Sequence, residues 1–344
     1  MAYISFQPTD FFSPKLYTGT GATHNVTGVG FQPDFVWMKR RDGSASHRLC
    51  DSVRGATKLL QSNATDAEQT DANTLTAFDS DGFTLGADSA PYNVNVSGQT
   101  MVSWNWKMGT TSGLSGGTIT PSSYSFDTTA RQSVIAYTGT GSTATVPHGL
   151  GATPGLIIVK RLDTTDNWWT HVKSMTGGQY IALNGTSAAG TATSVWNDTL
   201  PTSTVFTVGT DVGVNASGGT FIAYCFAPKK GYSSFGKYVG NGSADGPFVN
   251  IGFRPAYLIL RRTDSGGDWF CWDNKRGPYN VNTPMLAPNA VTAETSTAIP
   301  DFLSNGFKLR STNVDANASG GTYIYMAFAE FPLVSSNSKA GTAR

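Results

Sequence analysis

The feature that most constrains the fold is a unit that occurs three times along the chain. Each unit opens on a Tyr-x-Gly-x-Gly block, continues with a proline before an apolar run and two basic residues, and closes on a Ser-Gly block before an apolar, aromatic-rich run. The tyrosine precedes the proline by 16, 17 and 17 residues, and the proline precedes the serine by 64, 63 and 64. Blocks at such constant distances identify internal repeats. These residues are Tyr17, Pro33 and Ser97 in unit one, Tyr137, Pro154 and Ser217 in unit two, and Tyr238, Pro255 and Ser319 in unit three.

The repeated blocks predict strands. In the closing run of unit one, Val102, Trp104 and Trp106 alternate with other residues, as in a strand with one face on a core. The runs after the prolines are apolar on both faces, which is typical of central strands with a proline at the mouth. Asp-Gly and Asn-Gly pairs predict hairpins over 78–83 and 302–307. No segment requires a helix, and 66–74 is the best candidate for one or two helical turns. We therefore expect an all-β protein with three tandem antiparallel β-sandwich repeats of about 90–100 residues.

The spacing also predicts how the units are joined. The prolines are 121 and 101 residues apart, so about 20 extra residues separate units one and two. Those residues are rich in Gly, Ser and Thr and read as a flexible linker, which favours some independence for unit one, whereas the short second joint suggests that units two and three pack together. Three units in series would form a row or a compact cluster with pseudo-threefold symmetry. The expected boundaries are an attachment peptide 1–16, repeats 17–108, 131–228 and 234–332, a linker 109–130 and a loose tail 333–344.

Composition excludes several classes of protein. Charged residues make up 14% of the chain against roughly 25% in an average domain. Lys+Arg is 24 and Asp+Glu is 23, so a phosphate-tracking nucleic-acid binder or a polybasic membrane-surface module is not expected. No apolar stretch is long enough for a transmembrane helix, and the first residues do not resemble a secretory signal. Three widely spaced cysteines form neither a disulfide framework nor a zinc pattern, and we interpret them as core residues.

Catalytic and metal patterns are weak. Asp51 and Asp273 each lie 18 residues after their proline and are followed three residues later by Arg54 and Arg276. We interpret each pair as an ion pair that pins a turn, with a ligand-binding pair as the alternative; unit two has neither partner. Four histidines occupy unequal positions, and His148 has no nucleophile beside it. The Asp-Ser-Asp-Gly run at 79–82 lacks the glutamate of a calcium loop. We expect no catalytic residue, no metal and no cofactor.

Two repeated features allow a functional interpretation. The basic pairs after the central runs, such as Lys39-Arg40, mark either the exit of a strand into solvent or a contact between neighbouring units. Aromatic clusters follow the central strands of units two and three, where they could belong to the core or could stack on sugars. If any residues bind glycan or a partner, our first choices are Trp168, Trp169, His171, Trp269, Trp272 and Asp273.

The blocks together resemble a known module. Tyr-Thr-Gly-x-Gly, Gly-Phe-x-Pro-Asp-Phe-Val-Trp-x-Lys, Asp-x-x-Arg-Gly and Asp-Gly-Phe are similar to a repeat common in virion proteins of tailed bacteriophages, usually described as tail or tail-fibre-like. The resemblance covers residues 6 to about 332 and is best in unit one. Unit two departs from it at Asp-x-x-Arg-Gly and at the Asp-Gly-Phe hairpin. The resemblance implies a virion location and implies no catalytic residue.

Three functional hypotheses follow. The first is a short tail fibre or receptor-binding component that adheres to the host surface and contacts other virion proteins, assembled in the host cytoplasm. It would be a homo-oligomer, with a trimer favoured, and a host-surface glycan is its possible ligand. The second is a capsid-surface decoration or head fibre. The third, of another class, is a glycan-degrading depolymerase.

Overall fold

Strands dominate the fold, as the sequence predicts. The computed structural model describes residues 6–88, 92–297 and 299–331, and the predicted tail 333–344 lies outside them. Its helices there are the 3-10 turn η1 (Pro8–Asp10) and three single turns, α1 (Thr193–Trp196), α2 (Val212–Asn215) and α3 (Val314–Asn317). The all-β prediction is confirmed. The expected helical turns over 66–74 are wrong, because this segment contains strand β6 (Gln69–Thr70), which pairs with β5 (Lys58–Leu59).

A main antiparallel sheet recurs with one strand order. The order is β1-β9-β3-β4 in unit one, β11-β18-β13-β14 in unit two and β19-β25-β21-β22 in unit three. In each unit the closing run therefore lies between the opening strand and the central strand. The bounds are β1 Phe12–Thr18, β9 Thr100–Trp106, β3 Phe35–Arg40 and β4 Arg48–Asp51; β11 Gln132–Thr138, β18 Thr220–Phe226, β13 Leu156–Arg161 and β14 Trp168–Val172; β19 Ser233–Val239, β25 Thr322–Ala329, β21 Pro255–Arg262 and β22 Trp269–Asp273.

Each unit also has a smaller sheet. The predicted hairpins are present, with Phe78 opposite Phe83 and Phe302 opposite Phe307. In unit two, β15 and β16 extend the main sheet beyond β14. The bounds are β2 His24–Thr27, β8 Gly82–Leu85 and β7 Leu75–Asp79; β12 Ala144–Pro147 and β17 Val205–Val208; β20 Phe248–Asn250, β24 Gly306–Leu309 and β23 Pro300–Leu303; β15 Gln179–Ala182 and β16 Gly190–Thr191.

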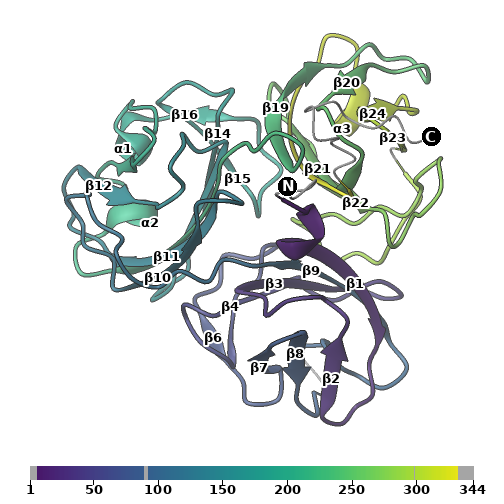
Figure 1. Ribbon diagram of the computed structural model, residues 1–344. Coiled ribbons are helices and arrows are strands. Elements are labelled where there is room, and N and C mark those ends of the chain that lie inside the picture. The colour runs from purple at the N-terminus through teal and green to yellow at the C-terminus, as the bar shows by residue number, and fades with distance from the viewer. Residues whose placement is uncertain (1–5, 89–91, 298, 332–344) are drawn as a thin grey trace, which may run out of the picture.

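The three main sheets face one shared core. Figure 1 shows the units as three lobes around a centre, the compact pseudo-threefold arrangement. At this centre the last large residues of the closing strands meet: the ring centroids of Trp106, Phe226 and Phe328 are 5.5 to 6.0 Å apart. Such aromatic pairs add about 0.5–1.5 kcal/mol each beyond the area that they bury. The alternation of the closing strands thus points their large residues at the other units.

The opposite face of each main sheet covers a separate core within its own unit. In unit one Val36 and Met38 of β3 pack with Phe83 and Leu85 of β8. Units two and three have equivalent clusters under their smaller sheets. Because both faces of the central strands are buried, these strands are apolar up to the basic pairs that end them.

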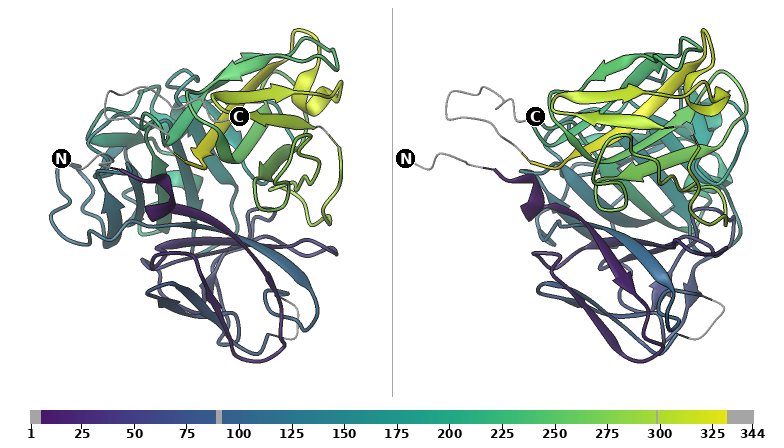
Figure 2. Two further views of the ribbon diagram at one scale, coloured as in Figure 1. Left: turned by 45° about the vertical axis from the view of Figure 1, so that its right-hand side comes forward. Right: turned by 90° about the vertical axis from the view of Figure 1, so that its right-hand side faces the viewer.

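The structure differs from the predicted boundaries at both ends of unit one. Residues 12–16, assigned to an attachment peptide, belong to β1, and Phe12 lies 5.1 Å from Phe328 between ring centroids. The described parts of both chain ends therefore lie at the same end of the assembly (Figure 2). Residues 123–127 of the predicted linker form strand β10 at the edge of the sheet of unit two.

The connection between units one and two is anchored rather than free. The buried Asp34 carboxylate accepts from the backbone N–H of Met108 at 2.7 Å and from the Ser125 hydroxyl at 3.0 Å. Ile119, within the same connection, is buried in the core of unit two. Unit one therefore does not have the independence that the length of the connection suggested.

Candidate functional site

Three equivalent junctions close the units into a ring. In each, a backbone N–H from one unit donates to the carbonyl just after the central strand of another: Glu68 to Leu162, Ala189 to Thr263 and Glu294 to Arg41, at 2.8 to 2.9 Å. We name these the 1–2, 2–3 and 3–1 junctions. Their bonds connect residues far apart in the sequence, so the ring holds every unit against both others.

The first residue of each basic pair belongs to a junction. Lys39 donates to the carbonyl of Val291, and Lys160 donates to that of Thr65, at 3.3 and 3.2 Å. Arg261 donates to Ser187 at 2.6 Å. Burial lowers the pKa of both lysines to about 8. The contact between neighbouring units, one of the two interpretations of these pairs, is what the structure shows for their first members.

The second residue of each basic pair forms a local salt bridge near the surface. Arg40, Arg161 and Arg262 form salt bridges of 2.6 to 3.0 Å with an aspartate two residues later. These exposed pairs contribute little to stability. The repeated Lys/Arg-Arg motif therefore combines one inward and one outward cation.

The aspartate–arginine pairs are buried and reach across junctions. The Asp51 carboxylate accepts from Arg54 Nε at 2.6 Å and from the Tyr224 hydroxyl of unit two at 2.7 Å. Burial lowers the pKa of Arg54, but Asp51, Tyr224 and Cys50 together raise it by more, so this pKa lies above its ordinary value. The outer face of the guanidinium contacts Glu68 at 3.3 Å.

Unit three repeats this arrangement. Asp273 accepts from Arg276 Nε at 2.5 Å and from Trp104 Nε1 of unit one at 3.0 Å. Arg276 then reaches Glu294 at 3.4 Å, and Glu294 also binds Arg41 of unit one at 2.9 Å. Both pairs thus pin a turn, as we interpreted them, and also join two units.

Unit two has lost this network as a set. The strand registers place Val172 at the position of the two aspartates, and Met326 of unit three faces it at the position of Tyr224 and Trp104. Val172 and Met326 line one small apolar cavity. Met175 replaces the arginine and Ala189 the glutamate. None of the described residues that line this cavity is charged.

The residues predicted to bind glycan are in the wrong place for it. Trp168 and Trp272 are 0% exposed, and His171, Trp269 and Asp273 are buried too. Trp168 Nε1 donates to Gln61 O of unit one at 2.8 Å, and Trp269 Nε1 donates to Ala182 O of unit two at 3.0 Å. Trp169 is half-buried, and its Nε1 donates to Asp166. Sugar stacking needs an open ring face, so this prediction is corrected: Trp168 and Trp269 are junction residues.

His47 is the equivalent of these two tryptophans and was missed. Its Nδ1 accepts from Trp37 Nε1 at 2.8 Å, and its Nε2 lies 2.9 Å from the Ala287 carbonyl of unit three. With both bonds made, the ring is neutral and carries its proton on Nε2. Burial lowers the pKa of His47 well below its ordinary value. The sequence did not indicate this role, because His47 differs in residue type from Trp168 and Trp269. What the three side chains have in common for this role is a ring N–H donor.

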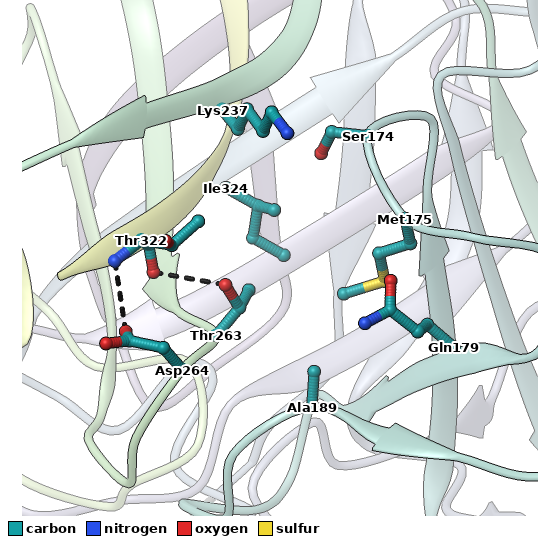
Figure 3. Close-up of a pocket in the computed structure, with 9 residues that line it drawn as sticks. All are labelled: Ser174, Met175, Gln179, Ala189, Lys237, Thr263, Asp264, Thr322 and Ile324. Carbon is teal, nitrogen blue, oxygen red and sulfur yellow. Dashed lines mark hydrogen bonds between the residues drawn. The ribbon is translucent and has the colours of Figure 1, made fainter.

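Among the described residues, the 1–2 and the 2–3 junctions each open into a cleft at the surface. The 1–2 cleft has a volume of about 540 Å³, and Arg54, Glu68 and Asp163 are among its lining residues. The 2–3 cleft has a volume of about 280 Å³ (Figure 3). Its lining side chains converge from units two and three: Ser174, Met175, Gln179, Ala189, Lys237, Thr263, Asp264, Thr322 and Ile324. These clefts are the candidate functional sites.

Comparison with known families places the chain. Residues 7–332 match the family model described as Domain of unknown function (DUF7483). The chain is a DUF7483 protein. No curated protein and no solved structure matches it.

Other candidate groups of this DUF7483 protein have structural roles. The Asp81 carboxylate accepts from the backbone of Gly28 and Gly30, which makes its Asp-Gly pair a turn. His148 is buried, and burial lowers its pKa to about 4. All three cysteines are buried and free. Across residues 6–88, 92–297 and 299–331 no group of His, Cys, Asp and Glu is arranged to hold a metal ion. No helix in the same residues is long and apolar enough to cross a membrane.

Proposed function

We propose that this DUF7483 protein is a virion protein of a tailed bacteriophage, a tail-fibre or receptor-binding component that adheres to glycan on the host surface. The adhesive role rests on where the repeated residues lie within each unit. The repeated polar and aromatic motifs face the junctions, and the 1–2 and 2–3 junctions open at the surface into clefts with polar lining residues. The virion location rests on the resemblance of the repeat blocks.

The non-catalytic part of the proposal rests on the carboxylates of the larger cleft. Glycoside hydrolysis needs two carboxyl groups, one of them a general acid with a raised pKa. Glu68 and Asp163 both line the 1–2 cleft. Asp163 is hydrogen-bonded to Arg161, which lowers the pKa of its carboxyl, opposite to the shift that a general acid requires. Glu68 is held by Arg54 and Lys58.

Binding to host cells tests the adhesive role. The fluorescently labelled full chain should bind host cells and should lose binding after the surface polysaccharide is stripped. Equal binding to stripped cells would contradict a glycan ligand. Incubation with purified host polysaccharide should release no reducing ends, and their appearance would instead support the depolymerase.

Position in the virion needs a separate measurement. The capsid-decoration alternative predicts antibody label over the head, whereas the tail proposal predicts label at the tail tip in electron micrographs of virions. A homo-oligomer, with a trimer favoured, remains part of the proposal, and light scattering on the full chain tests it. The shared core already brings three units together within one chain, so a threefold arrangement of the modules needs no second copy.

A further inference from the structure

The 2–3 cleft lacks the groups that occupy the equivalent place elsewhere. At the 1–2 junction the carboxylate of Glu68 lies 3.3 Å from Arg54. At the 3–1 junction Glu294 binds both Arg276 and Arg41. At the 2–3 junction Met175 and Ala189 stand at those positions, so both the carboxylate and its arginine are absent. Met175 and Ala189 line the 280 Å³ cleft.

Lys237 brings to this cleft a positive charge that the equivalent strand position of the other two units lacks. The strand registers place it at the position of Leu16 in unit one and Ala136 in unit two. Lys237 is exposed, lines the cleft and extends its amine toward Ser174 (Figure 3). Among the described residues it has no ion-pair partner. A cation without a partner therefore lies in the cleft from which the repeat's carboxylate is missing.

The other charge in the cleft is already compensated. The Asp264 carboxylate pairs with Arg262 at 3.0 Å and accepts from the backbone N–H of Thr322 at 3.0 Å. In Figure 3 it points at that N–H, on the far side of the cleft from Lys237. The field that a ligand meets is therefore set mainly by the lysine.

The remaining lining suits a sugar ring. Gln179 supplies an amide group, and Thr263 supplies a hydroxyl that already donates to the Thr322 carbonyl at 3.1 Å, beside the apolar side chains of Met175 and Ile324. The Ser174 hydroxyl is buried and has no hydrogen-bond partner among the described residues. The Gln179 Oε1 accepts from the backbone of Thr176 at 2.9 Å, which leaves its amide N–H groups as donors. Sugars present the same mixture of apolar C–H faces and hydroxyls, whereas an acidic peptide side chain would use only the lysine.

We propose that the 2–3 cleft binds a carboxylate-bearing sugar residue, a hexuronate, with its carboxylate on Lys237 Nζ and its hydroxyls toward the Gln179 amide. This inference rests on the proposed function and names the class of glycan.

Titration of the full chain with D-glucuronate, followed by NMR, tests the site. Glucuronate should shift resonances around the cleft, and D-glucose should bind about tenfold more weakly, since a charge-assisted hydrogen bond is worth roughly that factor. Lys237→Gln should weaken glucuronate binding to the level of glucose. Lys230→Gln, an exposed lysine outside the cleft, is the matched control and should change nothing.

A second variant adds a negative charge to the cleft. Ala189→Glu places a carboxylate at the end of the cleft away from Lys237 (Figure 3), and charge repulsion should weaken glucuronate binding in a folded protein. Unchanged binding in either Lys237→Gln or Ala189→Glu would overturn the assignment. Binding of N-acetylglutamate as tight as that of glucuronate would also overturn it, in favour of a peptide carboxylate.

The site and the proposed function fail in different ways. If the wild-type chain adheres to host cells and Lys237→Gln adheres equally well, adhesion stands and the cleft assignment is overturned. If glucuronate binding depends on Lys237 but the chain does not adhere to host cells, the cleft assignment is supported and the adhesive role fails.

Discussion

The 1–2 and 2–3 junctions place opposite chemistry on the same backbone arrangement. In the first, Asp51, Arg54 and Tyr224 form a buried polar network with bonds of 2.6 and 2.7 Å. In the second, Val172 and Met326 line an apolar cavity at the corresponding place. The comparison teaches that the fold does not need a charge at this position. It needs side chains that suit one another, either all polar and paired or all apolar.

The energetics explain why the set changes as a whole. Removing one member of a buried ion pair leaves the other charge without compensation, which costs several kcal/mol, whereas replacing the complete set with apolar residues is often neutral. Units one and three keep aspartate, arginine and glutamate, and unit two keeps none. The repeats of this one chain therefore contain both stable solutions and no intermediate.

The largest effect is expected from breaking a polar set at one position. Asp273→Asn removes the charge that compensates Arg276, whose side chain is 0% exposed. We expect the free energy of unfolding to fall by about 3–5 kcal/mol, measured by urea denaturation. Asp163→Asn, in an exposed pair with Arg161, is the control and should cost below about 1 kcal/mol. Equal losses in the two variants would contradict the role of burial.

We expect one added methyl group at Gly155 to destabilise the 2–3 junction. A Cβ added at Gly155 would lie 2.4 Å from the ring of Phe235 in unit three. We expect Gly155→Ala to cost about 1–3 kcal/mol through overpacking, measured by urea denaturation. Ala256 at the equivalent place shows that the backbone itself tolerates alanine. In a Phe235→Ala background Gly155→Ala should cost almost nothing, and a full loss there would contradict the clash.

Sequence reasoning succeeded where the repeat fixed periodicity. The alternation of Val102, Trp104 and Trp106 is sufficient for a strand, and the Asp-Gly and Asn-Gly pairs are sufficient for hairpins. These signals are local, so the all-β fold could be predicted. Which partner the buried face meets is not local: the same alternation fits a core within one unit and a core shared by three.

The aromatic residues show what could not be predicted from the sequence, namely which side chains meet between units. Trp168 and Trp269 have the composition of a sugar-binding cluster, yet both donate across junctions. His47 makes an equivalent bond across a junction, but a single histidine does not form an aromatic cluster in the sequence. The clefts were also hidden, since a lining such as Ser174, Lys237 and Thr263 comes from two units and has no motif. Only the packing of the units brings these side chains together.

His47 should make the 3–1 junction sensitive to acid. Its pKa is lowered in the folded protein, so below about pH 6.5 the unfolded chain binds a proton that the folded chain refuses. Stability therefore falls as pH falls, by up to about 1.4 kcal/mol per pH unit for this group. Urea midpoints at pH 6.5 and 5.5 should differ less in His47→Gln than in the wild type.

The pH range above the titration is the internal control for this prediction. Between pH 7 and pH 8 His47 is neutral in the folded protein and almost neutral in the unfolded chain, so its contribution to the pH dependence should nearly vanish. The same loss between pH 6.5 and 5.5 in wild type and variant would show that His47 does not link acid to the junction.

We expect the smallest change in the free energy of unfolding from a variant with four replacements. Asp51→Val, Arg54→Met, Glu68→Ala and Tyr224→Met together give the 1–2 junction the chemistry of the 2–3 junction. Because the only charge left without its partner among the described residues is Lys58, which lies at the surface, we expect the free energy of unfolding to stay within about 1 kcal/mol of the wild type. Asp51→Val alone should cost about 3–5 kcal/mol, so the four changes are strongly non-additive.

Urea denaturation of the single and quadruple variants decides between two explanations of unit two. If the quadruple variant is as unstable as Asp51→Val, then the apolar set works only on the backbone of unit two, and the junctions are not interchangeable. If it is as stable as the wild type, the polar networks of units one and three are not needed for folding. Their retention then calls for a reason outside stability, and the 1–2 cleft that Arg54 and Glu68 line is the place to seek it.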